Sequence, residues 1–105
     1  MDSTMVSNSY QVFMNEAPEH SKVWMEAVQK LDAASSLDKK TEEIAYIAVM
    51  AAVGLDCGIP FHVKSAKMHG ALRDEIISAI LLGLPAAGNK VVKALPIALE
   101  AFDEV

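Results

Sequence analysis

Residues 43–70 read EIAYIAVMAAVGLDCGIPFHVKSAKMHG, and this stretch decides the fold. Its first part, Ile44–Val53, is apolar on every side of a helix, which is typical of a helix in a core or between subunits. Gly54 ends this helix, and a second one begins near Pro60, because the first turn of a helix does not need the N–H that proline lacks. Gly70 is a natural stop for the second helix. The stretch therefore predicts a helical hairpin.

Three side chains with reactive groups flank the corner of this hairpin. Glu43 opens the first helix, Cys57 is the only cysteine of the chain, and His62 lies at the start of the second helix. The free N–H groups of a helix start favour a thiolate, and a nearby imidazole makes a thiol more nucleophilic. A carboxylate and an imidazole together can also transfer protons as general acid and base. We therefore predict a catalytic site at Glu43, Cys57 and His62.

The rest of the chain also reads as helix. Apolar residues at helical spacing predict helices over about 8–17, 18–33, 38–53, 60–70, 73–84 and from 89 to 102, the last with a kink at Pro96. No segment alternates with period two, so no sheet is expected. We therefore predict an all-α single domain of six helices over residues 1–105, with residues 1–7 as a loose N-terminus.

The composition favours an oligomer. The 105 residues suit one compact domain, and 52% of them are apolar while only 6% are aromatic. A small monomer has a large surface for its volume and needs fewer apolar residues than this. We assign the excess to contacts between subunits and predict a homo-oligomer.

Charge and cysteine content disfavour several classes of protein. The net charge is −5 and the cations form no basic stripe, so nucleic acid is not an expected partner. The longest apolar runs are shorter than the roughly 20 residues that cross a bilayer, so no membrane partner is expected. No N-terminal stretch resembles an export signal, and a lone cysteine forms no internal disulfide. These features predict a cytoplasmic protein.

Several short motifs carry a family resemblance. The segment Leu37-Asp38-x-Lys40-Thr41-x-Glu43-Ile44 is followed, after an Ala/Val-rich helix, by His62-Val63-Lys64-x-Ala66, Gly70-Ala71 and Asp74-Glu75-Ile76. Together with the separation of nineteen positions from the glutamate to the histidine, this order resembles the carboxymuconolactone decarboxylase family, which includes AhpD-like alkylhydroperoxidases. The resemblance covers about residues 37–102. It implies an AhpD-like all-α fold that assembles as a homotrimer or homohexamer.

The chain departs from the peroxidase branch of that family at the redox centre. This branch carries Cys-x-x-Cys, with cysteines seven and four residues before the histidine, and those positions are Leu55 and Gly58 here. Cys57 falls between them, so the dithiol cycle of the AhpD-like branch cannot run. The decarboxylase branch also lacks the cysteine pair and keeps the histidine, and its substrate is a small carboxylated lactone.

Three hypotheses for function follow, and we rank thiol-dependent peroxidase chemistry first. A peroxide would oxidise Cys57 to a sulfenic acid, which an outside thiol or Cys57 of a neighbouring subunit would resolve. In the second hypothesis His62 and Glu43 act as general acid and base on a small carboxylated compound, and Cys57 is a bystander. In the third the protein is a non-catalytic, oligomeric ligand-binding protein. Each residue also has a structural alternative: a buried apolar Cys57, a packing His62 and a Glu43 that stabilises a helix start.

A metal site is not expected. His69 lies seven residues after His62 on the same helix face, but the chain has no pair of histidines four apart and no other common ligand spacing. We therefore expect no metal and no cofactor. The expected partners are a small-molecule substrate, either a peroxide or a small carboxylated compound, and other copies of the chain.

Overall fold

The computed structural model describes residues 7–104, and within this range all regular structure is helical, with no strand. The predicted all-α fold is confirmed. The predicted loose terminus falls, except for Ser7, outside the described residues; the hydroxyl of Ser7 accepts a hydrogen bond from the backbone N–H of Tyr10 at 3.2 Å and caps the first helix. The chain divides into two compact units, residues 1–38 and 39–105, and each is described separately. The single domain over 1–105 stays a prediction.

The first unit is a pair of helices, α1 (Asn8–Glu16) and α2 (Pro18–Ala34). They are joined by the hydroxyl of Tyr10, which donates to the sulfur of Met25 at 2.7 Å. Of the described residues in this unit, Ser21 alone is buried, so the two helices enclose no apolar core of their own. They instead border an open, almost wholly apolar hollow of about 670 Å³, lined by Phe13, Glu19, His20, Val23, Trp24 and Ala27.

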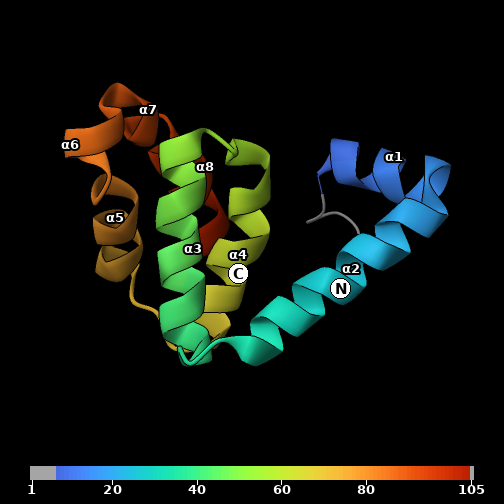
Figure 1. Cartoon of the computed structure of the whole chain (residues 1–105). Helices are drawn as coiled ribbons and strands as arrows, with labels where there is room; N and C mark the ends of the chain where they lie inside the picture. Colours follow the sequence, from blue (N-terminus) through green and yellow to red (C-terminus); the bar gives the residue numbers. More distant parts are fainter. Residues whose placement is uncertain (1–6, 105) are drawn as a thin grey trace. The chain divides into compact units, whose positions relative to one another are not determined.

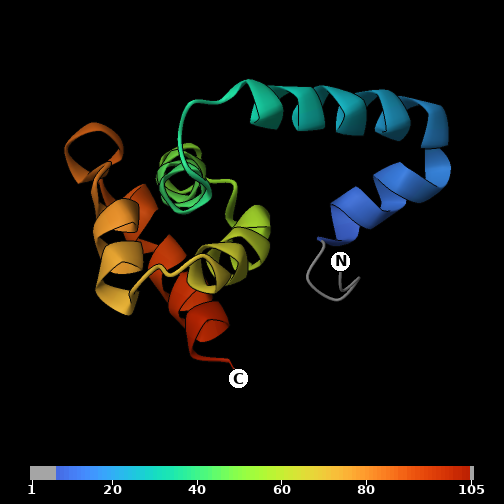
Figure 2. The same cartoon turned by 90° about the horizontal axis from the view of Figure 1, so that it is seen from below.

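The second unit contains the core. Helix α3 (Lys39–Val53) packs against α4 (Ile59–Met68) and α5 (Arg73–Leu81), and α8 (Ala94–Asp103) packs against the same two helices (Figure 1, Figure 2). The four helices can approach closely because many of the residues between them are small. The fully buried aliphatic side chains are Ile47, Met50, Ile59, Val63, Ile76, Ile80 and Val91, and they interleave with Ala51, Ala66, Ala94 and Ala98.

The predicted hairpin is formed by α3 and α4. Gly54 has φ +79°, a left-handed conformation that favours glycine, and it ends α3. One 3₁₀ turn, η2 (Asp56–Gly58), makes the corner, and α4 begins at Ile59 with Pro60 in its first turn. The hairpin brings the start of α4 back along α3, where the site lies.

The predicted last helix is divided. Residues 84–103 form α6 (Leu84–Ala87), α7 (Asn89–Val92) and α8, and the chain breaks at Lys93 rather than bending at Pro96. The reason is the proline itself. The ring of Pro96 clashes with the backbone carbonyl of Val92, four residues earlier. Proline also has no N–H to donate to that carbonyl. The helix therefore ends just before the position where this hydrogen bond is missing.

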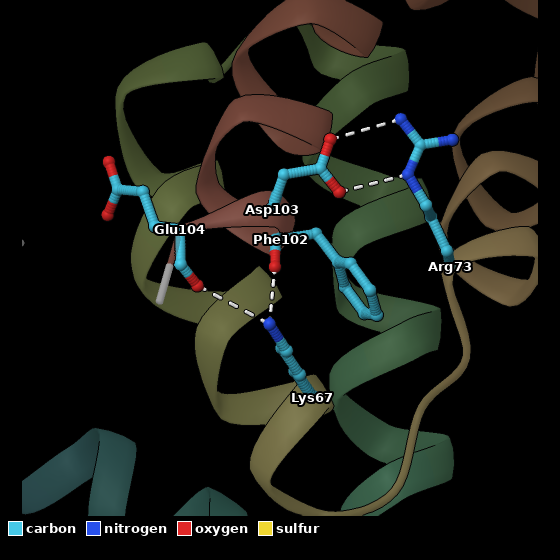
Figure 3. A network of polar contacts seen from close by, with 5 residues as sticks. All are labelled: Lys67, Arg73, Phe102, Asp103 and Glu104. Carbon is cyan, nitrogen blue, oxygen red and sulfur yellow. Dashed lines mark hydrogen bonds and ion pairs between the residues drawn. The ribbon is translucent and has the colours of Figure 1, made fainter.

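A polar network fastens the C-terminal end of α8 to α4 and α5 (Figure 3). The ammonium of Lys67 donates to the carbonyl of Phe102 at 2.6 Å and to that of Glu104 at 3.4 Å, which satisfies carbonyls that the end of a helix leaves free. The guanidinium of Arg73 binds both carboxylate oxygens of Asp103, at 3.0 and 3.1 Å. Because these side chains are exposed, we assign the network to holding the chain end in place rather than to much stability.

Candidate active site

The structure brings together two of the three predicted site residues. Glu43 lies near the start of α3 and His62 in the first turns of α4, and Nδ1 of His62 is 3.0 Å from Oε2 of Glu43. Glu43 is buried, with 5% of its surface exposed, whereas a quarter of the His62 side chain is exposed. The hairpin therefore holds a buried acid behind a partly exposed imidazole.

Glu43 is held by more than the imidazole. The hydroxyl of Ser65 donates to it, and Nζ of Lys39 is 4.0 Å from its Oε1. Burial by itself raises the pKa of the Glu43 carboxyl. The hydrogen bonds from His62 and Ser65 and the positive charges of His62 and Lys39 outweigh burial, and the pKa of Glu43 is lowered overall. Glu43 is therefore a carboxylate at neutral pH.

The charge of Glu43 fixes the tautomer of His62. A carboxylate only accepts hydrogen bonds, so Nδ1 of His62 must carry the proton in their contact. In the neutral ring the free lone pair then lies on Nε2, which can accept a proton from a ligand. Once His62 is protonated, the adjacent carboxylate stabilises its charge, which is the role of the aspartate in a Ser-His-Asp triad. An imidazole oriented in this way can exchange a proton at Nε2.

Two aromatic rings border the imidazole. The ring of Tyr46 meets that of His62 edge to face, with centroids 4.8 Å apart and planes at 81°. The ring of Phe61 does the same at 5.1 Å and 87°. Tyr46 is 43% exposed, so it lies at the surface beside the site.

Sequence reasoning missed Tyr46 and Ser65 as members of the site. Tyr46 follows Glu43 by three residues, and Ser65 follows His62 by three. Residues three apart share a face of a helix, so the positions of Glu43 and His62 contained the signal that identifies both.

Cys57 lies apart from this pair in its contacts. It occupies the middle of the η2 corner, and its side chain is exposed. The thiol makes no hydrogen bond to Glu43, to His62 or to any other residue within 7–104. Its participation in the site stays a prediction.

The position of the missing second cysteine is occupied by Gly58. The backbone there is right-handed, with φ −87° and ψ −12°, so no special conformation requires glycine. A Cβ on this residue would lie 3.0 Å from the sulfur of the buried Met50, so this side chain would have to shift by a few tenths of an ångström.

The described residues contain no group of side chains suited to bind a metal ion. Over residues 7–104, no three His, Cys, Asp or Glu side chains are grouped closely enough to hold an ion. In the same range, none of the helices combines the length and the hydropathy needed to cross a membrane.

The fold and the site together define a helical protein with a paired carboxylate and imidazole. The sequence matches the Carboxymuconolactone decarboxylase family over residues 18–100, and the protein belongs to this family. The resemblance drawn from the motifs around Glu43 and His62 is thereby confirmed. No significant match was found among curated proteins or among solved structures.

Proposed function

We propose that the protein is an acid–base enzyme of the decarboxylase type, acting on a small carboxylated compound. His62 transfers the proton, and Glu43 orients the His62 ring through the contact with Nδ1. The observation that carries this proposal is the 3.0 Å contact between Nδ1 of His62 and a buried carboxylate. The sequence ranked thiol chemistry first, but the contact favours the imidazole and the thiol has no comparable partner.

The chemistry needs a substrate whose departing carboxylate is on a saturated carbon that is linked to a carbonyl through a C=C bond, as in an unsaturated lactone acid. The bond to the carboxyl carbon breaks, CO₂ leaves, and the electron pair moves through the conjugated atoms to the carbonyl oxygen. Protonated His62 then donates its Nε2 proton to carbon, and the neutral ring takes up another proton from water. Glu43 holds the ring in place during each donation by accepting the hydrogen bond from Nδ1. Carboxymuconolactone, the compound in the family name, is therefore the first substrate to test.

A second candidate, thiol-dependent peroxidase activity, is supported by the exposure of Cys57. A peroxide ROOH would transfer one oxygen to the thiolate, giving ROH and a sulfenic acid. Two equivalents of an external thiol would reduce the sulfenic acid back to the thiol, and the products are a disulfide and water. This reaction requires an accessible sulfur, which the corner provides.

Cys57→Ser separates the two candidates. We expect this variant to release CO₂ from carboxymuconolactone at the wild-type rate, because the acid–base reaction does not use sulfur. Peroxide consumption with dithiothreitol as reductant, if the wild type has it, is expected to vanish. A Cys57→Ser variant that loses CO₂ release with unchanged helicity by circular dichroism would contradict the acid–base proposal.

The homotrimer or homohexamer remains part of the proposal. Val49 and Val53 form a short exposed apolar row on α3, four residues apart so that they share one face. We expect Val49→Glu to shift light-scattering mass toward the monomer, because it places a charge in this row. Met68→Glu, at an exposed apolar residue of α4, is the control and should leave the mass unchanged. A wild-type monomer at micromolar concentration would contradict the assembly.

A further inference from the structure

The two tyrosines of the chain have different surroundings. The hydroxyl of Tyr10 is engaged with the sulfur of Met25. The ring of Tyr46 contacts the ring of His62, but among the described residues 7–104 its hydroxyl has no hydrogen-bond partner. A phenol donor without a protein partner thus stands beside the proton-transfer residue.

The ring contact places the Tyr46 side chain beside the imidazole that a ligand must reach. Glu43 already occupies Nδ1 of His62, so a ligand meets the ring at the other nitrogen, and a quarter of the His62 side chain is exposed. Phe61, the other aromatic neighbour of the imidazole, has no polar side-chain group, and Glu43 is buried, whereas Tyr46 is 43% exposed. Of these side chains in contact with the imidazole, Tyr46 is therefore the one that is both exposed and able to donate.

We propose that Tyr46 is a further catalytic residue, whose hydroxyl donates a hydrogen bond to the carbonyl oxygen of the substrate. This inference rests on the proposed acid–base function. As CO₂ leaves, negative charge moves to that oxygen, and a fixed donor stabilises it more in the transition state than in the substrate. Tyr46 would thus donate a hydrogen bond to the carbonyl oxygen, while His62 protonates the substrate carbon. This role of Tyr46 narrows the expected substrates to small carboxylated compounds that also carry a conjugated carbonyl.

The expected effect of removing the hydroxyl is moderate. Loss of a buried oxyanion donor lowers kcat by about 100- to 1,000-fold. Because Tyr46 is partly exposed, water can replace part of its hydrogen bond, and we expect Tyr46→Phe to lower kcat by about 10- to 100-fold. The ring and its contact with His62 remain in this variant, so KM should change less than kcat.

The experiment compares three variants with the wild type in CO₂ release from carboxymuconolactone. Tyr46→Phe tests the inference, Tyr10→Phe is the matched control with unchanged kcat, and His62→Gln tests the underlying function. The NMR titration of the His62 ring in Tyr46→Phe should follow that of the wild type, which separates loss of a donor from displacement of His62. Light scattering should show an unchanged mass, because the substitution leaves Val49 and Val53 in place.

The outcomes separate the two proposals. If His62→Gln is inactive and Tyr46→Phe keeps the wild-type kcat, the role of Tyr46 is wrong and the acid–base function stands. A Tyr46→Phe variant whose His62 titration moves together with its activity also overturns the direct role. If the wild type releases no CO₂, or His62→Gln releases as much as the wild type, the function and the role of Tyr46 fail together.

Discussion

His62→Gln is expected to lower the rate of CO₂ release from carboxymuconolactone by about 100- to 10,000-fold, the range that a positioned general acid or base supplies. The glutamine amide can still donate to Glu43, so the local packing survives. It cannot take up or release a proton at neutral pH, and the substrate carbon then receives its proton from water alone. Steady-state rates at substrate concentrations above KM give the comparison.

The matched control for this variant lies on the same helix. His69 is exposed near the end of α4, and its Nδ1 contacts the backbone carbonyl of Ser65 at 2.8 Å. His69→Gln should keep the wild-type rate, because this imidazole has no acid beside it and lies two turns from His62. Retention of more than a tenth of the wild-type rate by His62→Gln would mean that another group transfers the proton.

Glu43→Gln is expected to reduce both activity and stability. The amide cannot stabilise protonated His62, so the rate falls. The free energy of unfolding at pH 7 should fall by about 1–3 kcal/mol, the contribution of a hydrogen bond to a charged group. Urea unfolding at a series of pH values measures this loss.

The sign of the pH dependence follows from the lowered pKa of Glu43. Its pKa is lower in the folded protein than the ordinary value of 4.5, so its contribution to stability is fully present above that value. The contribution is lost as the pH falls through the lower folded pKa. The stability difference between the wild type and Glu43→Gln should therefore be largest at neutral pH and shrink in acid.

The control for this second prediction is Glu100→Gln on α8, an exposed carboxylate of the same unit. It should change the free energy of unfolding by less than about 0.5 kcal/mol, as surface substitutions usually do. A Glu43→Gln protein as stable as the wild type at pH 7, or a stability difference that grows in acid, would show that the carboxylate is not held by the contacts described.

The helices and the hairpin could be predicted because their signals are local. Gly54 and Pro60 set the corner, and the apolar run before them sets the buried helix, whatever the rest of the chain does. The meeting of Glu43 with His62 followed from the same hairpin and from the family spacing. The break at Lys93 was missed because the prediction placed the effect of Pro96 at the proline rather than three residues before it.

Other parts of the site depend on details that periodicity does not contain. Whether Cys57 faces the protein or the solvent is decided by a three-residue 3₁₀ turn, in which one change of backbone torsion redirects a side chain. Tyr46 lies on a helix that is apolar all round, so the pattern did not distinguish its exposed side from its buried side. The open hollow between α1 and α2 could not be foreseen either, because helical spacing does not show what the apolar side of α2 packs against.

The right-handed backbone at Gly58 has a consequence for engineering this corner. A Cβ at that position needs no left-handed conformation, but it would lie 3.0 Å from the sulfur of the buried Met50, which must then shift by a few tenths of an ångström. Leu55 is exposed, and a substitution at an exposed position usually disturbs the core little. Installing the thiol pair of the peroxidase branch at these two positions therefore depends on how the core around Met50 repacks.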